Sequence, residues 1–221
     1  MTAGSYKAIY SDAVGEIRTT LANDGKRLTM RLGAVEFEGD DLDAFEPVGS
    51  PDQEALSRFT LDTNGWLCAF SLDFKMPVHV LVGGAEEEQG QLVVHVEIGR
   101  PSRRGSPEEV RVRLELAVGD RTFASPGLSG WFEDELLAIQ KALPAAWHLK
   151  MCFGCAFSDY SPAGHGLFGG LACFRGNKAA YLAVRTKADF WPVLDTMTEA
   201  VQETYLCPEF EVRKPGTGYR G

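Results

Sequence analysis

Cysteine is the residue type with the most chemical potential in this 221-residue chain, and its distribution is uneven. Cys68 stands alone, whereas the other four lie in the final third: Cys152, Cys155, Cys173 and Cys207. An odd number of cysteines without a secretion signal argues against a disulfide framework and favours reduced thiols. We therefore expect any thiol or metal chemistry to lie in the C-terminal part.

The sequence Cys152-Phe-Gly-Cys155 suits a zinc ion, because two thiolates at this spacing can bind one metal and Gly154 eases the turn between them. Tetrahedral zinc takes four ligands, and the candidates for the other two positions are His165, Cys173 and Cys207. A second Cys-x-x-Cys pair, which a zinc ribbon would have, is missing. The predicted cofactor is therefore zinc or none.

Two other interpretations of these thiols stay open. Free cysteine is among the most buried residue types, so all four can be core residues on strands, with Cys152 and Cys155 on opposite faces. Alternatively, Cys155 or Cys173 is a nucleophile, with His165 as its base and Asp159 as the orienting acid. A thioredoxin-type centre is not expected, because proline and glycine soon after the pair disfavour a helix there.

The segment between residues 158 and 170 has more backbone specialisation than a simple connection needs. It holds four glycines, a proline, an aspartate and a histidine. Long loops of this kind are often binding surfaces, although a glycine-rich hairpin end is an equal alternative. The candidate binding residues are Asp159, Tyr160, Ser161, His165 and, just beyond the loop, Arg175. The letters G-x-G-x-x-G occur here without a βαβ unit, so a dinucleotide site is not expected.

The elements that must position these residues indicate an α+β protein. Short alternating runs in the first half predict an antiparallel sheet, with strands at 6–10, 16–21, 27–32, 67–74, 78–82, 91–98 and 110–118. Pro77 between two of these runs suggests an edge or a bend. We expect a β-rich lobe over residues 1–124 and a cysteine-containing α+β lobe over 125–221, or one continuous domain.

The C-terminal part is predicted to be a helix–strand–strand–strand–helix unit. An apolar stripe predicts the first helix over Trp131–Leu143, with Ser129 as N-cap, and a second stripe predicts a helix over about Trp191–Tyr205. The three strands expected between them are Leu149–Phe157, Leu171–Phe174 and Tyr181–Val184.

Composition excludes several classes of function. The formal net charge is −9, with a pI near 5.0, so neither nucleic acid nor an anionic membrane surface is an expected partner. No apolar run is long enough for a membrane span and no signal peptide is recognisable, so we expect a cytoplasmic protein. Nine acids against one base lie between Ala34 and Asp62. That run is either a solvated face or a docking surface for a basic protein.

The residues from Trp147 to Gly164 (WHLKMCFGCAFSDYSPAG), then Phe168–Arg175 and Cys207-Pro-Glu-Phe210, resemble an uncharacterised family of bacterial proteins, mainly from actinomycetes. The resemblance covers about residues 125–221, and the family brings no established activity. Size, acidity and loop content are also similar, more loosely, to those of small immunity proteins encoded beside bacterial toxins.

We therefore expect a cytoplasmic interaction or regulatory protein that binds a partner, with a structural cysteine cluster that is zinc-bound or simply buried. The alternative is an enzyme with a thiol or zinc centre around Cys152, Cys155, His165 and Cys173. The sequence leaves the oligomeric state open.

Overall fold

A large, curved antiparallel sheet dominates the computed structural model, which describes residues 4–84, 86–103 and 107–219. Its strands run in the spatial order β11-β10-β9-β8-β1-β2-β3-β4-β5, and β12 joins the free edge of β8. Their bounds are β1 Gly4–Asp12, β2 Gly15–Asn23, β3 Leu28–Leu32, β4 Val35–Gly39, β5 Glu46–Pro47, β8 Phe70–Val82, β9 Glu86–Ile98, β10 Val110–Val118, β11 Arg121–Ala124 and β12 His148–Leu149. The α+β class expected from the sequence is confirmed.

The alternation of apolar and polar side chains explains why these segments form strands of a sheet with one buried face. On β10, Val112, Leu114 and Leu116 are buried while Arg111 and Arg113 face water, as the sequence pattern predicts. Each buried Val or Leu contributes roughly 1.5–3 kcal/mol relative to its exposed state. The long strands β8 and β9 show the same alternation from Phe70 to Val80 and from Gly90 to Ile98.

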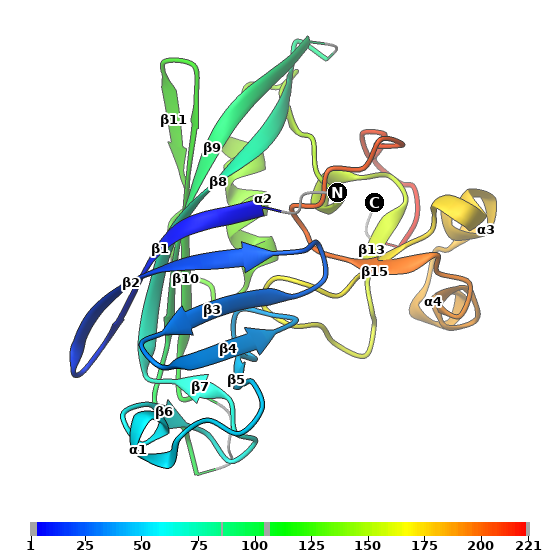
Figure 1. Ribbon diagram of the computed structural model, residues 1–221. Coiled ribbons are helices and arrows are strands. Elements are labelled where there is room, and N and C mark those ends of the chain that lie inside the picture. Colours follow the sequence, from blue (N-terminus) through cyan, green and yellow to red (C-terminus); the bar gives the residue numbers. More distant parts are fainter. Residues whose placement is uncertain (1–3, 85, 104–106, 220–221) are drawn as a thin grey trace.

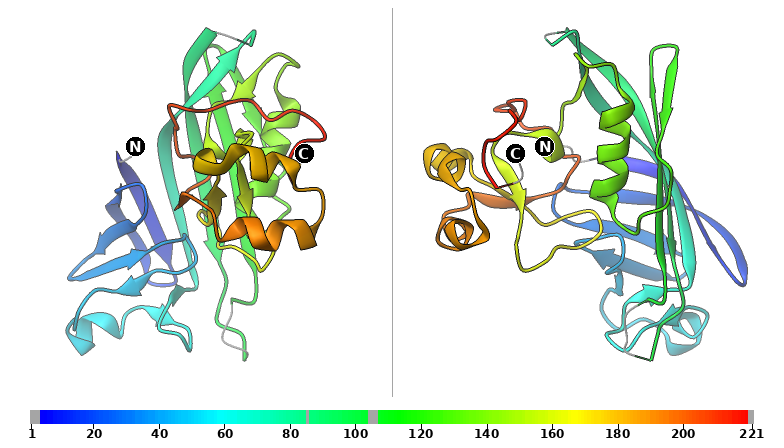
Figure 2. Two further views of the ribbon diagram at one scale, coloured as in Figure 1. Left: turned by 90° about the vertical axis from the view of Figure 1, so that its right-hand side faces the viewer. Right: turned by 180° about the vertical axis from the view of Figure 1, so that it is seen from behind.

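Helix α2 (Phe132–Ala142) lies against the inner face of the sheet (Figure 2). It buries Phe132, Leu136 and Ile139, and so confirms the first predicted helix. The predicted N-cap is wrong: Trp131 precedes the helix without a side-chain cap, because the Glu135 carboxylate instead reaches back to accept the N–H groups of the 127–129 turn.

A smaller end structure extends the sheet near β4 and β5. It consists of the short helix α1 (Gln53–Leu56) and the two-stranded ribbon of β6 (Thr60–Leu61) and β7 (Leu67–Cys68). Figure 1 shows these elements together at the foot of the sheet.

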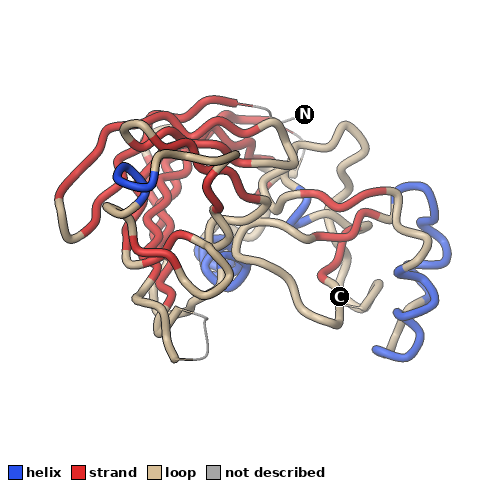
Figure 3. Tube along the Cα trace, turned by 60° about the horizontal axis from the view of Figure 1, so that its bottom comes forward, coloured by secondary structure: helices blue, strands red, loops and turns tan. Residues whose placement is uncertain are grey.

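The C-terminal segment, which we define as residues 148–219, is built from short elements. After β12 come a 3₁₀ turn at Cys152–Gly154 and another at Arg175–Asn177, a three-stranded sheet and two small helices; their bounds are β13 Ser158–Tyr160, β14 Leu171–Cys173, β15 Glu199–Val201, α3 Lys178–Ala183 and α4 Lys187–Leu194. Figure 3 shows the two helices at the end farthest from the large sheet.

Two elements predicted in this segment are wrong. The residues 181–184 belong mainly to helix α3, where the Tyr181 ring stacks on Phe174 at 4.7 Å, and do not form a strand. The predicted helix 191–205 ends at Leu194, and β15 follows. Of the apolar residues predicted to share one helix face, Leu194 ends α4 and Val201 is buried in β15, while Met197 between them is exposed.

The predicted strand 149–157 is also interrupted, by the 3₁₀ turn that begins at Cys152. The backbone N–H groups of Cys152 and Phe153 donate to the carbonyls of Tyr205 and Glu203 at 2.9 Å. Contacts with a distant part of the chain therefore replace the local ladder.

The hydrophobic core of the sheet continues through α2 into part of the C-terminal segment, and three smaller clusters fill the rest of that segment. Phe132 of α2 meets Phe168 edge-to-face at 5.0 Å, and Leu149, Met151 and Leu167 belong to the same buried cluster. The loop after β13 is thus anchored in the core of the sheet.

Candidate functional site

Four of the cysteines lie close together in the C-terminal segment, and all five in the chain are free and buried. Cys152, Cys173 and Cys207 pack in one small apolar cluster, and Cys155 lies in the neighbouring one. Burial raises the pKa of the Cys152 thiol far above its usual range, and the other three cysteines add to the shift. Burial also raises the pKa of Cys173. These two thiols are therefore protonated at neutral pH and poor nucleophiles.

The donor types around Cys152 fit a zinc ion, since thiolate sulfur is a preferred ligand. Among the residues that the structure describes, however, no three His, Cys, Asp or Glu side chains are arranged as a metal-binding group. The Cys152–Cys155 turn is a tight one, in which the Cys155 N–H donates to the Cys152 carbonyl at 3.1 Å. Zinc stays a prediction that metal analysis must decide.

His165 contacts aromatic rings and a carboxylate. Its ring lies 4.1 Å from that of Tyr160 and 5.0 Å from that of Trp131. Its Nδ1 donates to the Gly166 carbonyl at 2.9 Å, and Nε2 is 3.5 Å from a carboxylate oxygen of Glu133. None of these contacts is with a cysteine, so the sequence-predicted candidates divide into a thiol group and a histidine group.

The glycine-rich loop is held by two acids from the large sheet's far end. Asp41 accepts the N–H of Phe168, and Asp43 accepts that of Leu167, each at 3.3 Å. A Cβ on Gly166 would lie only 1.8 Å from Oδ2 of Asp41. Glycine is required there because a carboxylate occupies the space that a side chain would take.

These two members of the acidic run between Ala34 and Asp62 bond the glycine-rich loop. Burial, reinforced by the charge of Asp43, raises the pKa of Asp41 to about 6. Burial also raises the pKa of Asp43. Both residues are partly exposed, and their carboxyls bind backbone N–H groups of the loop.

The predicted loop residues differ in accessibility. Asp159 and Tyr160 are buried, Ser161 and His165 are partly exposed, and Arg175 pairs with Glu199. Ser161 accepts the N–H of Ala163 at 3.2 Å in a local turn. The positive charge of Arg175 offsets part of the rise that burial causes in the pKa values of Cys152 and Cys173, and both values stay raised.

Asp159, a candidate from the sequence, is tied to this region by two residues that the sequence did not single out, Tyr181 and Arg213. Asp159 accepts the Tyr181 hydroxyl at 2.8 Å, and Arg213 donates to that hydroxyl at 2.9 Å, to the Cys155 carbonyl at 2.8 Å and to the Ser158 carbonyl. No local pattern marks an arginine near the end of a chain for such a role.

Glu203 is another buried group that the sequence did not reveal. It accepts the Tyr160 hydroxyl at 3.0 Å, and its burial raises its pKa well above the usual range. The charges of Asp41 and Glu133 raise it further. The carboxyl is therefore held neutral at the junction between the C-terminal segment and the large sheet.

Two cavities border this junction. One, of about 470 Å³, lies beside Asp41 and Gln202. The other, of about 340 Å³, lies between α2 and the Cys152 turn, with Glu133, His148 and Arg213 in its wall. Raised carboxyl pKa values next to a cavity are a feature of many functional sites, although structural networks produce them too.

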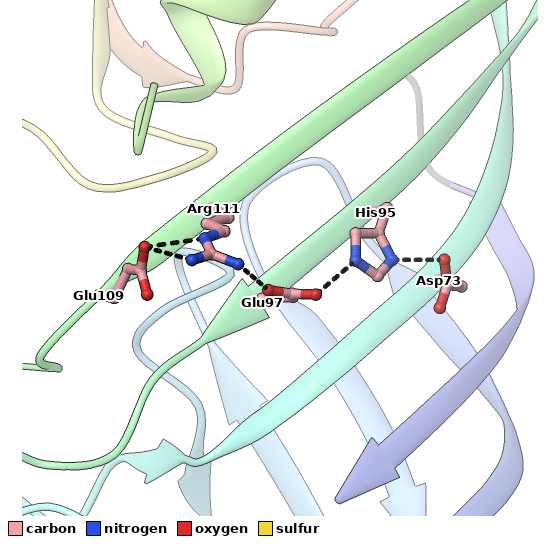
Figure 4. A network of polar contacts seen from close by, with 5 residues as sticks. All are labelled: Asp73, His95, Glu97, Glu109 and Arg111. Carbon is pink, nitrogen blue, oxygen red and sulfur yellow. Dashed lines mark hydrogen bonds and ion pairs between the residues drawn. The ribbon is translucent and has the colours of Figure 1, made fainter. Parts of the chain in front are cut away.

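A second polar network lies on the outer face of the large sheet (Figure 4). His95 on β9 bonds Asp73 at 2.8 Å and Glu97 at 3.2 Å, and Arg111 links Glu97 to Glu109. Burial of the imidazole would lower its pKa, but the bonds to the two carboxylates outweigh this and raise it. This network covers one stretch of an otherwise open face.

Fold and site together define an α+β protein in which a large antiparallel sheet supports a compact C-terminal segment rich in buried polar groups. The chain belongs to DUF6304, a family of unknown function whose model matches residues 4–158. The matched region contains the Cys152–Cys155 pair but neither Cys173 nor Cys207, and overlaps the region of sequence resemblance only up to residue 158. No curated protein and no solved structure matches the chain. Within the described residues, no helix has the length and apolar character of a membrane span.

Proposed function

We propose that this protein acts by binding a basic protein partner, as an interaction or regulatory protein, through an acidic edge around Trp66. We define the acidic edge as the exposed or partly exposed acids at the small end structure, Asp52, Glu54 and Asp62, together with Glu46 on the neighbouring strand β5. The observation that carries the proposal is the exposed residue Trp66, 39% accessible, in the same end of the molecule as four carboxylates that form no ion pair within the described residues.

Other acids of the run between Ala34 and Asp62 differ from those of the acidic edge, because they are paired with arginines. Arg27 pairs with Glu38 and Asp40, and Arg31 pairs with Glu36, so these acids are partly neutralised. The acidic edge lacks such partners. Unpaired carboxylates attract a basic partner and increase its rate of association.

Local structure fixes the position of the indole. Asp62 accepts the backbone N–H of Trp66 at 2.9 Å, and the Asp62 N–H donates to the Trp66 carbonyl at 2.8 Å. The Leu67 N–H donates to the Phe45 carbonyl, which brings Glu46 beside this turn. Tryptophan is enriched at binding hot spots, and its face also attracts lysine and arginine.

Titration with an arginine-rich peptide, followed by calorimetry at low and at physiological salt, tests the proposal. We expect saturable binding that Trp66→Ala and Glu46→Lys/Glu54→Lys each weaken about tenfold, since losing a hot-spot residue costs about 1–2 kcal/mol. The matched control replaces exposed acids elsewhere that form no ion pair within the described residues, Glu16→Lys/Glu115→Lys, with the same change in net charge. Equal loss in both double variants, with no effect of Trp66→Ala, would refute a specific surface.

In this proposal the four C-terminal thiols are structural. Elemental analysis distinguishes a zinc-bound cluster, with one zinc per chain, from a buried one with none. The enzyme alternative predicts a thiol that alkylates rapidly at neutral pH. Raised pKa values at Cys152 and Cys173 favour the structural role, and uniformly slow alkylation of the native protein is the expected result.

A further inference from the structure

Strands β1 and β8 are neighbours in the sheet only along part of their lengths. Their ladder runs from Asp12 opposite Phe70 to Ala8 opposite Phe74 and ends there. Both strands continue beyond this point, β1 back to Gly4 and β8 on to Val82, and β12 pairs with this edge of β8 only at Val80 and Leu81. Figure 1 shows β1 turning away while β8 and β9 continue upward together. We call the space between them the split groove; its volume is about 910 Å³.

Backbone geometry places hydrogen-bonding groups along both walls of the split groove. The carbonyl of His79 accepts the Lys150 N–H on the edge of β8 opposite β9, so odd-numbered residues of β8 point their N–H and C=O groups toward that edge. Lys75 and Pro77 therefore point their backbone groups into the groove. On β1, Ile9 lies opposite Asp73, so the backbone groups of Ile9 point toward β8. Those of Lys7 and Ser5, two and four residues away, point to the same side and therefore into the groove.

Pro77 agrees with this assignment. A proline has no N–H to donate, and it is tolerated in a strand where no neighbouring strand needs that bond. Its partner on the other side, Gln91 of β9, is in register without a bulge. The sequence-based expectation of an edge at Pro77 thus has its structural reason in the split groove.

The floor and sides of the groove are pre-formed. The rings of Tyr6 and Phe74 stack across the divergence with centroids 6.1 Å apart, and both are buried. Ile9 and Val93 add apolar surface on the outer side. A ligand would therefore meet a fixed surface and lose little free energy in ordering the protein.

The charges that line the split groove indicate which kind of ligand fits it. Lys7, Arg18 and Lys75 line the split groove, are exposed, and form no ion pair within the described residues. The one acid in the lining, Asp73, bonds His95. A chain with a net charge of −9 thus presents a local group of three unpaired cations around open strand edges.

We propose that the split groove binds an extended acidic segment of a partner protein, which adds a short strand to the open edges and places carboxylates against Lys7, Arg18 and Lys75. Strand addition supplies main-chain hydrogen bonds for affinity, and the cations select acidic sequences. This site is separate from the acidic edge and takes a segment of opposite charge.

A fluorescein-labelled octapeptide of alternating Glu and Val, followed by fluorescence anisotropy, is the probe. The intact protein should bind it saturably and should not bind the corresponding Lys–Val peptide. Lys7→Glu/Lys75→Glu should weaken binding about tenfold or more, because two attractive pairs become repulsive. The matched control Lys141→Glu/Lys214→Glu changes net charge equally with exposed lysines outside the groove, and should bind as the unmodified protein does.

Amide hydrogen exchange supplies a readout that charge alone would not move: the Lys7 and Lys75 amides should exchange more slowly when the peptide is bound. Equal weakening in the two double variants, or unchanged exchange at saturation, would overturn the proposal. Self-association of Lys7→Glu/Lys75→Glu, in a protein that never binds the peptide, would also overturn it, because the lysines would then only protect an open edge. Trp66→Ala should leave peptide binding intact, so this proposal and the acidic edge can fail separately.

Discussion

In the large sheet, β8 and β9 pair over thirteen residues, and the side chains that face the core alternate with those that face water. In the C-terminal segment the strands have two or three residues, and buried or partly buried side chains there bond side-chain and backbone groups far along the chain. The sheet is stabilised by many similar apolar contacts, so the loss of one removes only a small part of its total stability. The C-terminal segment depends on a few specific polar contacts, which leave unsatisfied groups when they are removed.

The strongest test of this difference is Gly166→Ala. The added Cβ would overlap the Asp41 carboxylate, and we expect a loss of about 3 kcal/mol in the free energy of unfolding, at the upper end of typical overpacking costs. Urea denaturation measures it. Asp41→Ala removes the obstacle, so the double variant should be more stable than the sum of the two single effects predicts. Strict additivity would show that the loop is not held against Asp41.

Arg213→Ala should have the next largest effect. It removes donors from the Cys155 and Ser158 carbonyls and from the Tyr181 hydroxyl, and we expect a loss of about 2 kcal/mol by urea denaturation. Arg213→Lys keeps the charge but not the planar fork, and should recover only part of the loss. Arg185 also donates to two carbonyls but at the surface, so Arg185→Ala is the matched control and should cost less. Equal losses would contradict the comparison.

The same difference explains how far the sequence could be interpreted. Period-two alternation predicted the strand at 110–118 because each apolar side chain there satisfies the same sheet. It also occurs in β4, where Val35 and Phe37 are buried between exposed or half-exposed glutamates, but the acids drew attention to charge and the strand was not predicted. In both strands the alternation of neighbouring residues is enough to predict the strand.

No local signal of this kind exists for the candidate site. The backbone of Cys152 and Phe153 bonds residues some fifty positions later, and Asp41 meets Gly166 across more than a hundred positions. The cysteines could be predicted to matter from their type and grouping. The roles of Glu203, Arg213 and Asp41 depend on tertiary contacts, which a single sequence does not reveal.

The pH dependence of stability gives a smaller and more specific test. The folded-state pKa of Asp41 is raised to about 6, so the folded protein binds a proton more tightly than the unfolded chain does. Asp41 therefore favours the folded state at pH values below its unfolded pKa of about 4, and this contribution is lost as pH rises from about 4 to about 6. We expect a difference of about 2 kcal/mol over that range, which Asp41→Asn should abolish.

Denaturation of the unmodified protein and of Asp41→Asn at several pH values measures this contribution. Other buried or partly buried carboxyls, Asp43 and Glu203, shift in the same direction and remain in the variant, so only the difference between the two proteins is assigned to Asp41. Parallel profiles would contradict a partly buried, proton-binding Asp41.

The smallest effect is expected on the outer face of the large sheet, at His95. Its bonds to Asp73 and Glu97 are partly exposed, and such pairs contribute about 0.5 kcal/mol. Because the folded-state pKa of His95 is raised, the contribution should be complete below the unfolded pKa of about 6.5 and lost as pH rises through the folded value. His95→Gln should thus matter at pH 5.5 and hardly at pH 8.5. A loss as large as that of Arg213→Ala would mean that the sheet also depends on single polar contacts, and the contrast between the two regions would fail.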